Sequence, residues 1–465
     1  YDAATANTTG GNLVAIGYQA MNSNTTGSNG VAIGYQALYT CTTGGENIAI
    51  GLQSLYSLTT ANYNVAIGYD AGEDVTTGDK NNFLGWRAGY NVTTGARNTA
   101  IGYESMYNNT TSDDSIAIGY QALYTGSTLT QQLAIGNQAG YNTTGSDNVF
   151  IGHEAAYTNS TGNSNTAIGH RVFRSNTTGS RCVALGLGAL DTNTTGDDNT
   201  AIGWGSLDAV TTGTRNVAVG NNALTSHTSN YCTAIGFEAG EDCNAQYNTF
   251  VGYQAGLNVT TGYQCIYIGS GAGNVATTGA QNVFIGHNIG TNTVTGGRNV
   301  FIGYNVQPSE GGDTIFIGAG NKTHTGDYTN NGFMGPGNSS GSYGGMYQGN
   351  NSSTWSTTSD IRIKKNIVDN DIGLKEILQL KVKDFEYRLP EEIEDEKIAS
   401  RAVASPGTKV GVIAQEVEDI LPNIVETHEA TGVKSVNADN MTWYLVNAVK
   451  ELSAEVEQLK SQLNN

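Results

Sequence analysis

A short motif, Ala-Ile-Gly or a close variant, returns along the first two thirds of the chain at nearly constant spacing. Its glycine falls at 17, 34, 51, 68, 85, 102, 119, 136, 152, 169, 186, 203, 220, 236, 252, 269, 286, 303 and 318. Fourteen of the eighteen intervals are 17 residues long, three are 16 and one is 15. Self-similarity at a fixed, short period indicates a solenoid or array whose units stack on their neighbours.

A typical unit runs from Asn24 to Thr40. Val31 and Ile33 flank one small residue, which is the period-two pattern of a strand. Gly34 follows, where the backbone must bend sharply or pack closely, and a Thr-Thr-Gly turn leads into the next unit. Seventeen residues are too few for a helical hairpin repeat. The pattern therefore predicts one coil of a parallel β-solenoid per unit.

Proline usage supports this prediction. The first proline of the chain is Pro308, and a coil whose N–H groups bond to neighbouring coils has little room for proline. We therefore expect a mainly β protein, with a solenoid of about 19 coils over residues 1–320. Each coil can bury only a few small side chains, so one chain makes a thin core. Three chains packed side by side would bury more, which favours a homotrimer.

The Val-Ala-Ile-Gly core, repeated from Asn12 to about Ala319, resembles the β-roll heads of trimeric autotransporter adhesins, although the spacing here is longer. This resemblance implies a trimeric, elongated fibre. A bacterial surface adhesin of that type is the alternative function. Such adhesins need a C-terminal membrane barrel, whereas the end of this sequence predicts a charged coiled coil.

The net charge of −19, with no basic run, argues against nucleic acid as a partner and against docking on an anionic membrane. No stretch approaches the roughly 20 apolar residues of a membrane span, so we expect no membrane insertion. The repeats also lack a clear pair of carboxylates for hydrolysing glycans, although Glu73-Asp74 and Glu241-Asp242 are acidic turns. The Thr-Thr pairs sit beside glycine in turns, which argues against an ice-binding solenoid.

The residue after the repeated glycine is often aromatic, and these positions form one row: Tyr18, Tyr35, Tyr69, Trp86, Tyr103, Tyr120, Trp204, Phe237, Tyr253 and Tyr304. The favoured interpretation is packing, between coils or at a trimer interface. The alternative is a stacking surface for a sugar or another receptor, with Trp86, Trp204, Tyr103 and Tyr120 as candidate contacts. His153, His170 and His287 occupy the same row without carboxylates at fixed spacing, so we predict no metal ligands, and no cofactor is expected.

The five cysteines are Cys41, Cys182, Cys232, Cys243 and Cys265. None forms a CxxC pair, and an odd count is no disulfide framework. Cys232 and Cys243 could meet on adjacent coils. The simpler interpretation is that these cysteines are small, buried, apolar residues.

Composition changes twice after the repeats. Residues 321–358 are rich in Gly, Asn and Ser and form a predicted neck, either a linker or a fibre end that orders only in the trimer. Residues 359–465 hold 33 of the 63 charged residues and predict a small α+β domain. We expect helices over 372–380, 415–420 and 440–463, strands over 382–387 and 409–414, and an acidic loop over 391–405. The apolar residues of the last helix form a heptad seam, typical of a coiled coil: Leu445, Val449, Leu452, Val456, Leu459 and Leu463.

The start of this region reads Ser-Asp-Ile-Arg-Ile-Lys-Lys-Asn-Ile, from Ser359 to Ile367. It is similar to the opening of the self-cleaving chaperone domains that terminate phage endosialidases, neck appendages and long tail fibres. Val410 to Val417 with Leu421-Pro422, and then Asp439 to Leu452, match that family's later blocks in order. The resemblance implies an intramolecular chaperone that aligns three fibre chains and then cuts itself off at the junction of Ser359 and Asp360.

The residues at this junction suit such chemistry. A serine hydroxyl is a weak nucleophile until a base removes its proton, and a lysine can act as that base when its pKa is lowered. Ser359 and Lys364 are the candidate pair, with Arg362 and Lys365 as cationic neighbours that lower the lysine pKa. Because the two are five residues apart, a turn or an adjacent subunit must bring them together. No activity on external substrates is expected.

These observations predict a trimeric phage tail fibre or spike that attaches to a host-cell surface receptor or glycan. We expect it in the virion, as a tail fibre or surface spike, and outside the cell after release. The sequence opens within a repeat, so an upstream virion or tail protein is expected to anchor it.

Overall fold

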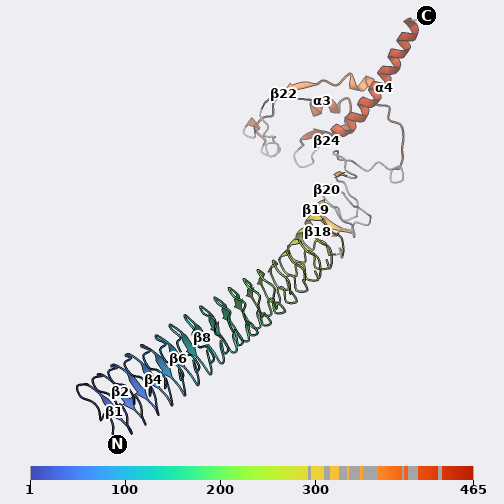
Figure 1. The fold of residues 1–465 in the computed structure, drawn as a ribbon. Helices are drawn as coiled ribbons and strands as arrows, with labels where there is room; N and C mark the ends of the chain where they lie inside the picture. Colours follow the sequence, from blue (N-terminus) through green and yellow to red (C-terminus); the bar gives the residue numbers. More distant parts are fainter. Residues whose placement is uncertain are drawn as a thin grey trace. The chain divides into compact units, whose positions relative to one another are not determined.

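The computed structural model describes residues 2–291, 295–307, 315–323, 332–334, 346–348, 365–389, 392–395, 407–427 and 432–463. The chain divides into two compact units, Tyr1–Thr357 and Thr358–Asn465 (Figure 1). Each unit has its own hydrophobic core. Most of the predicted neck lies outside the described residues, so the proposed three-part division of the chain stays a prediction.

The first unit is built from short strands that recur once per repeat. Their bounds are β1 (Val14–Ile16), β2 (Val31–Ile33), β3 (Ile48–Ile50), β4 (Val65–Ile67), β5 (Asn82–Leu84), β6 (Thr99–Ile101), β7 (Ile116–Ile118), β8 (Leu133–Ile135), β9 (Val149–Ile151), β10 (Thr166–Ile168), β11 (Val183–Leu185), β12 (Thr200–Ile202), β13 (Val217–Val219), β14 (Thr233–Ile235), β15 (Thr249–Val251), β16 (Ile266–Ile268), β17 (Val283–His287), β18 (Val300–Gln307), β19 (Ile315–Thr323), β20 (Gly332–Met334) and β21 (Met346–Gln348).

Each strand from β1 to β19 pairs in parallel with the next strand of the chain, at the same repeat position, as in Val14 with Val31. The loops follow the same rule, since the Gly34 N–H donates to the Ile16 carbonyl at 2.8 Å. The backbone of one coil is thus bonded to the coils before and after it, which explains the absence of proline from the repeats. The predicted mainly β fold with a parallel β-solenoid is confirmed (Figure 1).

The core of the solenoid is a column of small side chains. Where a large side chain replaces one of them, smaller residues in neighbouring positions make room for it. The middle residue of each three-residue strand from β2 to β16 is buried, and it is alanine in most of these coils. Phe83 replaces alanine in β5, and the buried leucine of neighbouring coils is then replaced by Gly72 and Gly89. A Cβ on either glycine would lie within 2.7 Å of the Phe83 ring. Large and small residues therefore alternate so that the volume of each coil stays constant.

Two buried ladders run beside the alanine column. The entry ladder is the residue just before each strand, usually asparagine: the Asn64 N–H donates to Asn47 Oδ1 at 3.0 Å, and Asn81 Nδ2 donates to the Gly95 carbonyl at 2.8 Å. The turn ladder is the residue before the Thr-Thr-Gly turn, such as Val92. The asparagines satisfy backbone groups that would otherwise be buried without a partner.

The second unit is a small α+β domain. Its elements are α1 (Leu374–Ile377), β22 (Lys383–Phe385), β23 (Lys409–Gly411), α3 (Ala414–Glu418), the 3-10 helix η3 (Pro422–Ile424), β24 (Val425–Thr427), β25 (Lys434–Val436) and α4 (Ala438–Leu463). Strand β22 pairs antiparallel with β23, and β24 with β25. Val417, Leu421, Ile424 and Tyr444 form the core. The predicted helices and strands are found as α1, β22, β23, α3 and α4, each one to several residues shorter than predicted except for α4. The elements η3, β24 and β25 were not predicted.

The first turns of α4 are held by the start of the domain. The Leu374 N–H donates to Glu451 Oε2 at 2.7 Å, and Asn447 Nδ2 donates to the carbonyls of Asn370 and Ile372 at 3.1 and 3.2 Å. None of the helices among the described residues is long and apolar enough to cross a membrane.

Candidate functional site

Four of the residues predicted to carry self-cleavage lie outside the described residues: Ser359, Asp360, Arg362 and Lys364. Their arrangement therefore stays a prediction. Lys365, the second candidate neighbour, is described and exposed.

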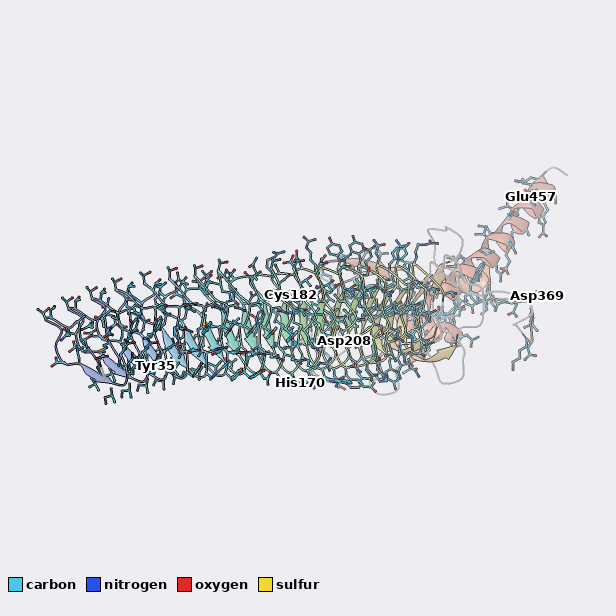
Figure 2. The ribbon with its side chains drawn as sticks, turned by 60° about the horizontal axis from the view of Figure 1, so that its bottom comes forward. Tyr35, His170, Cys182, Asp208, Asp369 and Glu457 are labelled. Atoms are coloured by element: carbon cyan, nitrogen blue, oxygen red, sulfur yellow. The ribbon has the colours of Figure 1, made fainter. Side chains whose placement is uncertain are left out.

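The aromatic row lies on the outside of the solenoid and its rings stack from coil to coil. Trp86 and Tyr103 have ring centroids 4.6 Å apart, and Tyr103 and Tyr120 are 5.4 Å apart. Tyr35 and His170, which Figure 2 labels, belong to the same exposed row. Three of the four candidate receptor contacts thus form one continuous stack, whereas Trp204 lies five coils further along, just after β12. Packing between coils and an exposed stacking surface coexist in this row.

Arg87 joins this row to a second one. Its guanidinium carbon lies 4.3 Å from the Trp86 ring centroid and 5.2 Å from that of Tyr90, and its Nε donates to Asp70 Oδ2 at 3.2 Å. Burial raises the pKa of the Asp70 carboxyl, and Arg87 opposes that rise. Stacked rings beside an ion pair are the surface chemistry that carbohydrate or polar peptide ligands contact.

The second row was missed by the sequence analysis. It is the residue five positions after the repeated glycine, and its half-buried tyrosines stack at centroid distances of 5.0 to 5.2 Å: Tyr90, Tyr107, Tyr124, Tyr141 and Tyr157. Burial raises the pKa of Tyr90 to about 12. The signal was present, because tyrosine returns at this position with the period of the repeat.

Further along, the second row carries acids. Asp208, which Figure 2 labels, occupies the position equivalent to Asp191 of the preceding coil. Burial raises the pKa of both carboxyls, and Asp191 adds to the rise at Asp208. Among the described residues, Asp191 Oδ1 is buried without a hydrogen-bond partner.

The outer face of the stacked strands is apolar. The first and third residues of each strand point outward, and many are large and substantially exposed, such as Ile16, Ile101 and Ile235. Together with the aromatic row they make an apolar strip along the solenoid. Contiguous exposed apolar surface of this extent is typical of an interface.

Helix α4 presents a second uncovered apolar surface. All six residues of the predicted seam are exposed, from 40% at Val456 to 85% at Leu463. The seam therefore does not pack on its own domain, which is what a coiled-coil helix in a single chain requires.

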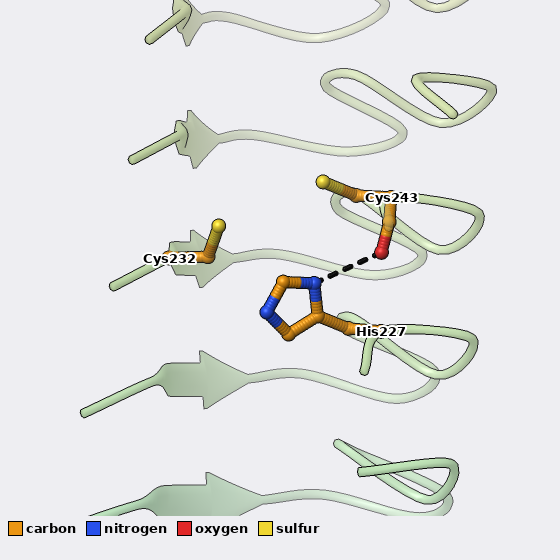
Figure 3. A group of neighbouring side chains, drawn as sticks. All are labelled: His227, Cys232 and Cys243. Atoms are coloured by element: carbon orange, nitrogen blue, oxygen red, sulfur yellow. Dashed lines mark hydrogen bonds between the residues drawn. The ribbon is translucent and has the colours of Figure 1, made fainter. Parts of the chain in front are cut away.

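The interior of the solenoid holds a cluster that was not predicted as a site. His227 and Cys243 belong to the turn ladder of adjacent coils, and Cys232 to the entry ladder (Figure 3). All three are fully buried, and their ligand atoms lie within 4.8 Å of one another. The five cysteines are buried and free, so the possible bond between Cys232 and Cys243 is not formed. Burial raises the pKa of Cys182 to about 12, whereas a hydrogen bond with Cys232 and the neighbouring His227 hold the pKa of Cys243 well below its ordinary value.

The fold defines the class of the protein: a parallel β-solenoid followed by a small α+β domain that ends in an unpaired coiled-coil helix. Residues 359–426 match the family model described as chaperone of endosialidase. The match supports the predicted chaperone domain over these residues, whereas the last predicted block, Asp439 to Leu452, lies beyond them. No match was found among curated proteins.

Proposed function

We propose that the protein is a trimeric tail fibre or spike for attachment to a host surface, whose C-terminal domain is an intramolecular chaperone that cuts itself off beside Ser359. The observation that carries the proposal is the chaperone-of-endosialidase match over residues 359–426, C-terminal to a β-solenoid in the same chain. The virion location and the role in attachment rest on this association of fibre and chaperone.

Two uncovered surfaces support the trimer. The apolar strip of the solenoid follows the stack of strands from coil to coil. The α4 seam is exposed over five helical turns or more. Both are surfaces that a second and third copy of the same chain would cover, since a heptad seam pairs with its own kind. The helix would align three chains, and the strip would then bury apolar area coil by coil.

Attachment is proposed for the stacked rings around Arg87. Trp86, Tyr103 and Tyr120 offer exposed aromatic faces, and the ion pair with Asp70 adds polar contacts. A host glycan or another surface receptor is the proposed ligand.

Self-cleavage is proposed for Ser359 and Lys364, acting once the subunits have packed. The Ser359 hydroxyl reaches the carbonyl of Thr358 through a five-membered ring, whereas the resemblance favours the bond between Ser359 and Asp360; the proposal leaves that choice open. In either case one peptide bond is broken and one water is consumed overall, which yields a carboxylate and an amine.

The mass of the purified chain under denaturing conditions tests this proposal. The parent should yield a fragment of about 11 kDa, the share of residues 359–465 in a 48.7 kDa chain. Ser359→Ala and Lys364→Ala should each leave the intact chain, because each removes one half of the dyad. Lys365→Ala is the matched control and should still be processed, although more slowly. Normal processing of the first two variants, or an uncut parent, would show the assignment to be wrong.

A further inference from the structure

We propose that His227, Cys232 and Cys243 bind one thiophilic metal ion, Zn²⁺ or Cu⁺, inside the solenoid. Thiolate and imidazole are the ligand types that these two ions prefer. The site is independent of the proposed attachment and self-cleavage. The sequence pattern predicted no metal here because the three ligands come from two ladders and two coils, without a CxxC or similar spacing.

The geometry brings one ligand atom from each residue to a common point. The three atoms lie within 4.8 Å of one another, and Figure 3 shows the side chains converging on the space between adjacent coils. Zinc sites have bonds of about 2.3 Å to sulfur and about 2.0–2.1 Å to nitrogen, so their ligand atoms lie about 3.5–3.8 Å apart. A contraction of at most about 1.3 Å between ligand atoms, through side-chain rotation, would close the site.

The hydrogen bonds of His227 leave its second nitrogen ready for a cation. Nδ1 lies 2.9 Å from the Cys243 carbonyl oxygen, which can only accept, so Nδ1 carries the proton. This N–H to carbonyl bond is the arrangement that orients metal-binding histidines. Nε2 then faces Asn216 Oδ1 at 3.2 Å, and that oxygen already accepts the Cys232 N–H at 2.9 Å. His227 Nε2 and Asn216 Oδ1 are thus two hydrogen-bond acceptors that face each other in a buried space. A bound cation would remove the electrostatic repulsion between them.

Both thiols are fully buried and share one hydrogen-bond acceptor. The S–H groups of Cys232 and Cys243 donate to the Ala245 carbonyl at 3.0 and 3.4 Å, and metal binding would replace these two bonds. Asn248 Nδ2 donates to Cys243 Sγ at 3.4 Å, a contact that supports a thiolate. Binding would form two metal–sulfur bonds and one metal–nitrogen bond and release two protons. Asn216 Oδ1, which lies 3.2 Å from His227 Nε2, could complete a fourfold zinc shell.

The place of the cluster within the repeat sets it apart. In the preceding coil the two ladder positions hold Val210 and Asn216. The next two segments that connect a turn-ladder residue to the following entry-ladder residue run from His227 to Cys232 and from Cys243 to Asn248. Each is one residue shorter than the segment from Val210 to Asn216 and lacks the Thr-Thr-Gly sequence. An equally short segment elsewhere, between Thr143 and Asn148, carries neither histidine nor cysteine. The shorter connecting segment therefore does not by itself explain why His227, Cys232 and Cys243 occur here. A metal ion that bridges adjacent coils would explain it.

The repeat supplies variants that should keep the fold. Cys232→Asn, Cys243→Val and His227→Val each install the residue common at that ladder position. Cys182→Asn is the matched control, because Cys182 is also a buried entry-ladder cysteine but belongs to no group of three candidate metal ligands among the described residues. Circular dichroism confirms that each variant is folded.

The test uses the full chain, purified with a reductant, stripped with a chelator and then loaded with Zn²⁺, with Cu⁺ under anaerobic conditions, or with Co²⁺ as a spectroscopic probe. We expect one bound ion per chain by elemental analysis, thiolate-to-Co²⁺ charge-transfer absorption, and a higher thermal midpoint in the parent and in Cys182→Asn. Each ligand variant should bind about 100-fold more weakly or worse.

Three results would overturn the proposal. The first is a folded parent that binds none of the three ions and shows no charge-transfer band. The second is undiminished binding by the combined Cys232→Asn and Cys243→Val variant, which would place the metal elsewhere. The third is a parent mass lower by two hydrogens under non-reducing conditions, with the loss abolished by Cys243→Val, which would make the pair a disulfide.

Discussion

At the scale of single residues, the repeated glycine is the position with the least freedom. Gly186 has φ +126°, and a Cβ there would lie 2.7 Å from the Gly203 carbonyl oxygen. The same relation recurs from coil to coil, because the stacking distance is set by backbone hydrogen bonds. Other left-handed positions are less demanding, and Gln36 and Leu38 adopt φ of 53° and 50° without glycine.

A paired substitution in one coil tests this distinction. Gly186→Ala adds a methyl group against a neighbouring backbone and forces a conformation reserved for glycine, so we expect a loss of about 2 kcal/mol or more. Gly188→Ala is the control: Gly188 has φ +66°, nothing within 4 Å of the added Cβ, and non-glycine residues at this position in many coils. The thermal midpoint of the full chain should fall for the first variant and change little for the second.

The buried acids of the second row predict a gain in stability on mild acidification. Burial raises the pKa of Asp191 and Asp208, so the folded state binds protons at a higher pH than the unfolded state. The free energy of unfolding therefore rises as pH falls from 7 toward the ordinary aspartate pKa of about 4. Asp114 and Asp198 have lowered pKa values, and their contribution is lost only below that range.

Thermal midpoints at pH 7 and pH 5 measure this effect. Asp191→Asn should raise the midpoint at pH 7 and shrink the difference between the two pH values. Asp198→Asn removes an exposed acid that pairs with Arg181 at 2.6 Å, and it should leave the difference unchanged. A parent that is less stable at pH 5 than at pH 7 would contradict the assignment.

At the scale of elements, the coil was predictable because its signals are local and periodic. The alternation of Val31, Ala32 and Ile33 predicted the strand, and Gly34 predicted a close approach of the backbones of two coils. The loop was not predictable in detail, because left-handed Gln36 and Leu38 depend on hydrogen bonds to other coils. The His227 cluster was missed for the same reason: residues 16 apart become neighbours only once the coils are stacked.

The predicted seam of α4 has its own test. Leu452→Asp places a charge in an exposed apolar seam without touching the core around Val417 and Leu421, so the domain should fold while the coiled coil fails. Light scattering on the uncut Ser359→Ala chain should give three chain masses, and the added Leu452→Asp should reduce this to one or cause aggregation. Gln458→Asp, exposed and off the seam, is the control. A trimer that tolerates Leu452→Asp would show that α4 does not direct assembly.

At the scale of the whole molecule, the two units have opposite requirements. The strands of the solenoid pair with those of neighbouring coils, so folding of one chain could begin at many points along it. Three such chains could then associate with their coils out of register. A terminal helix that fixed three chains in register, as proposed, would remove that ambiguity. If the C-terminal domain is then cut away as proposed, an unfolded fibre would lack its route to the aligned state, and its stability would be kinetic.

The hydrogen bonds between successive coils, such as Gly34 N–H to Ile16 carbonyl, also decide how a single solenoid responds to pulling. They point along the stack, so a load on its two ends acts on one coil at a time. A released coil of 17 residues lengthens from about 4.8 Å to at most about 60 Å. If the protein tethers a particle to a surface as proposed, pulling on the particle would unfold the coils one after another at similar forces. Each unfolding event would absorb mechanical work before the attachment breaks.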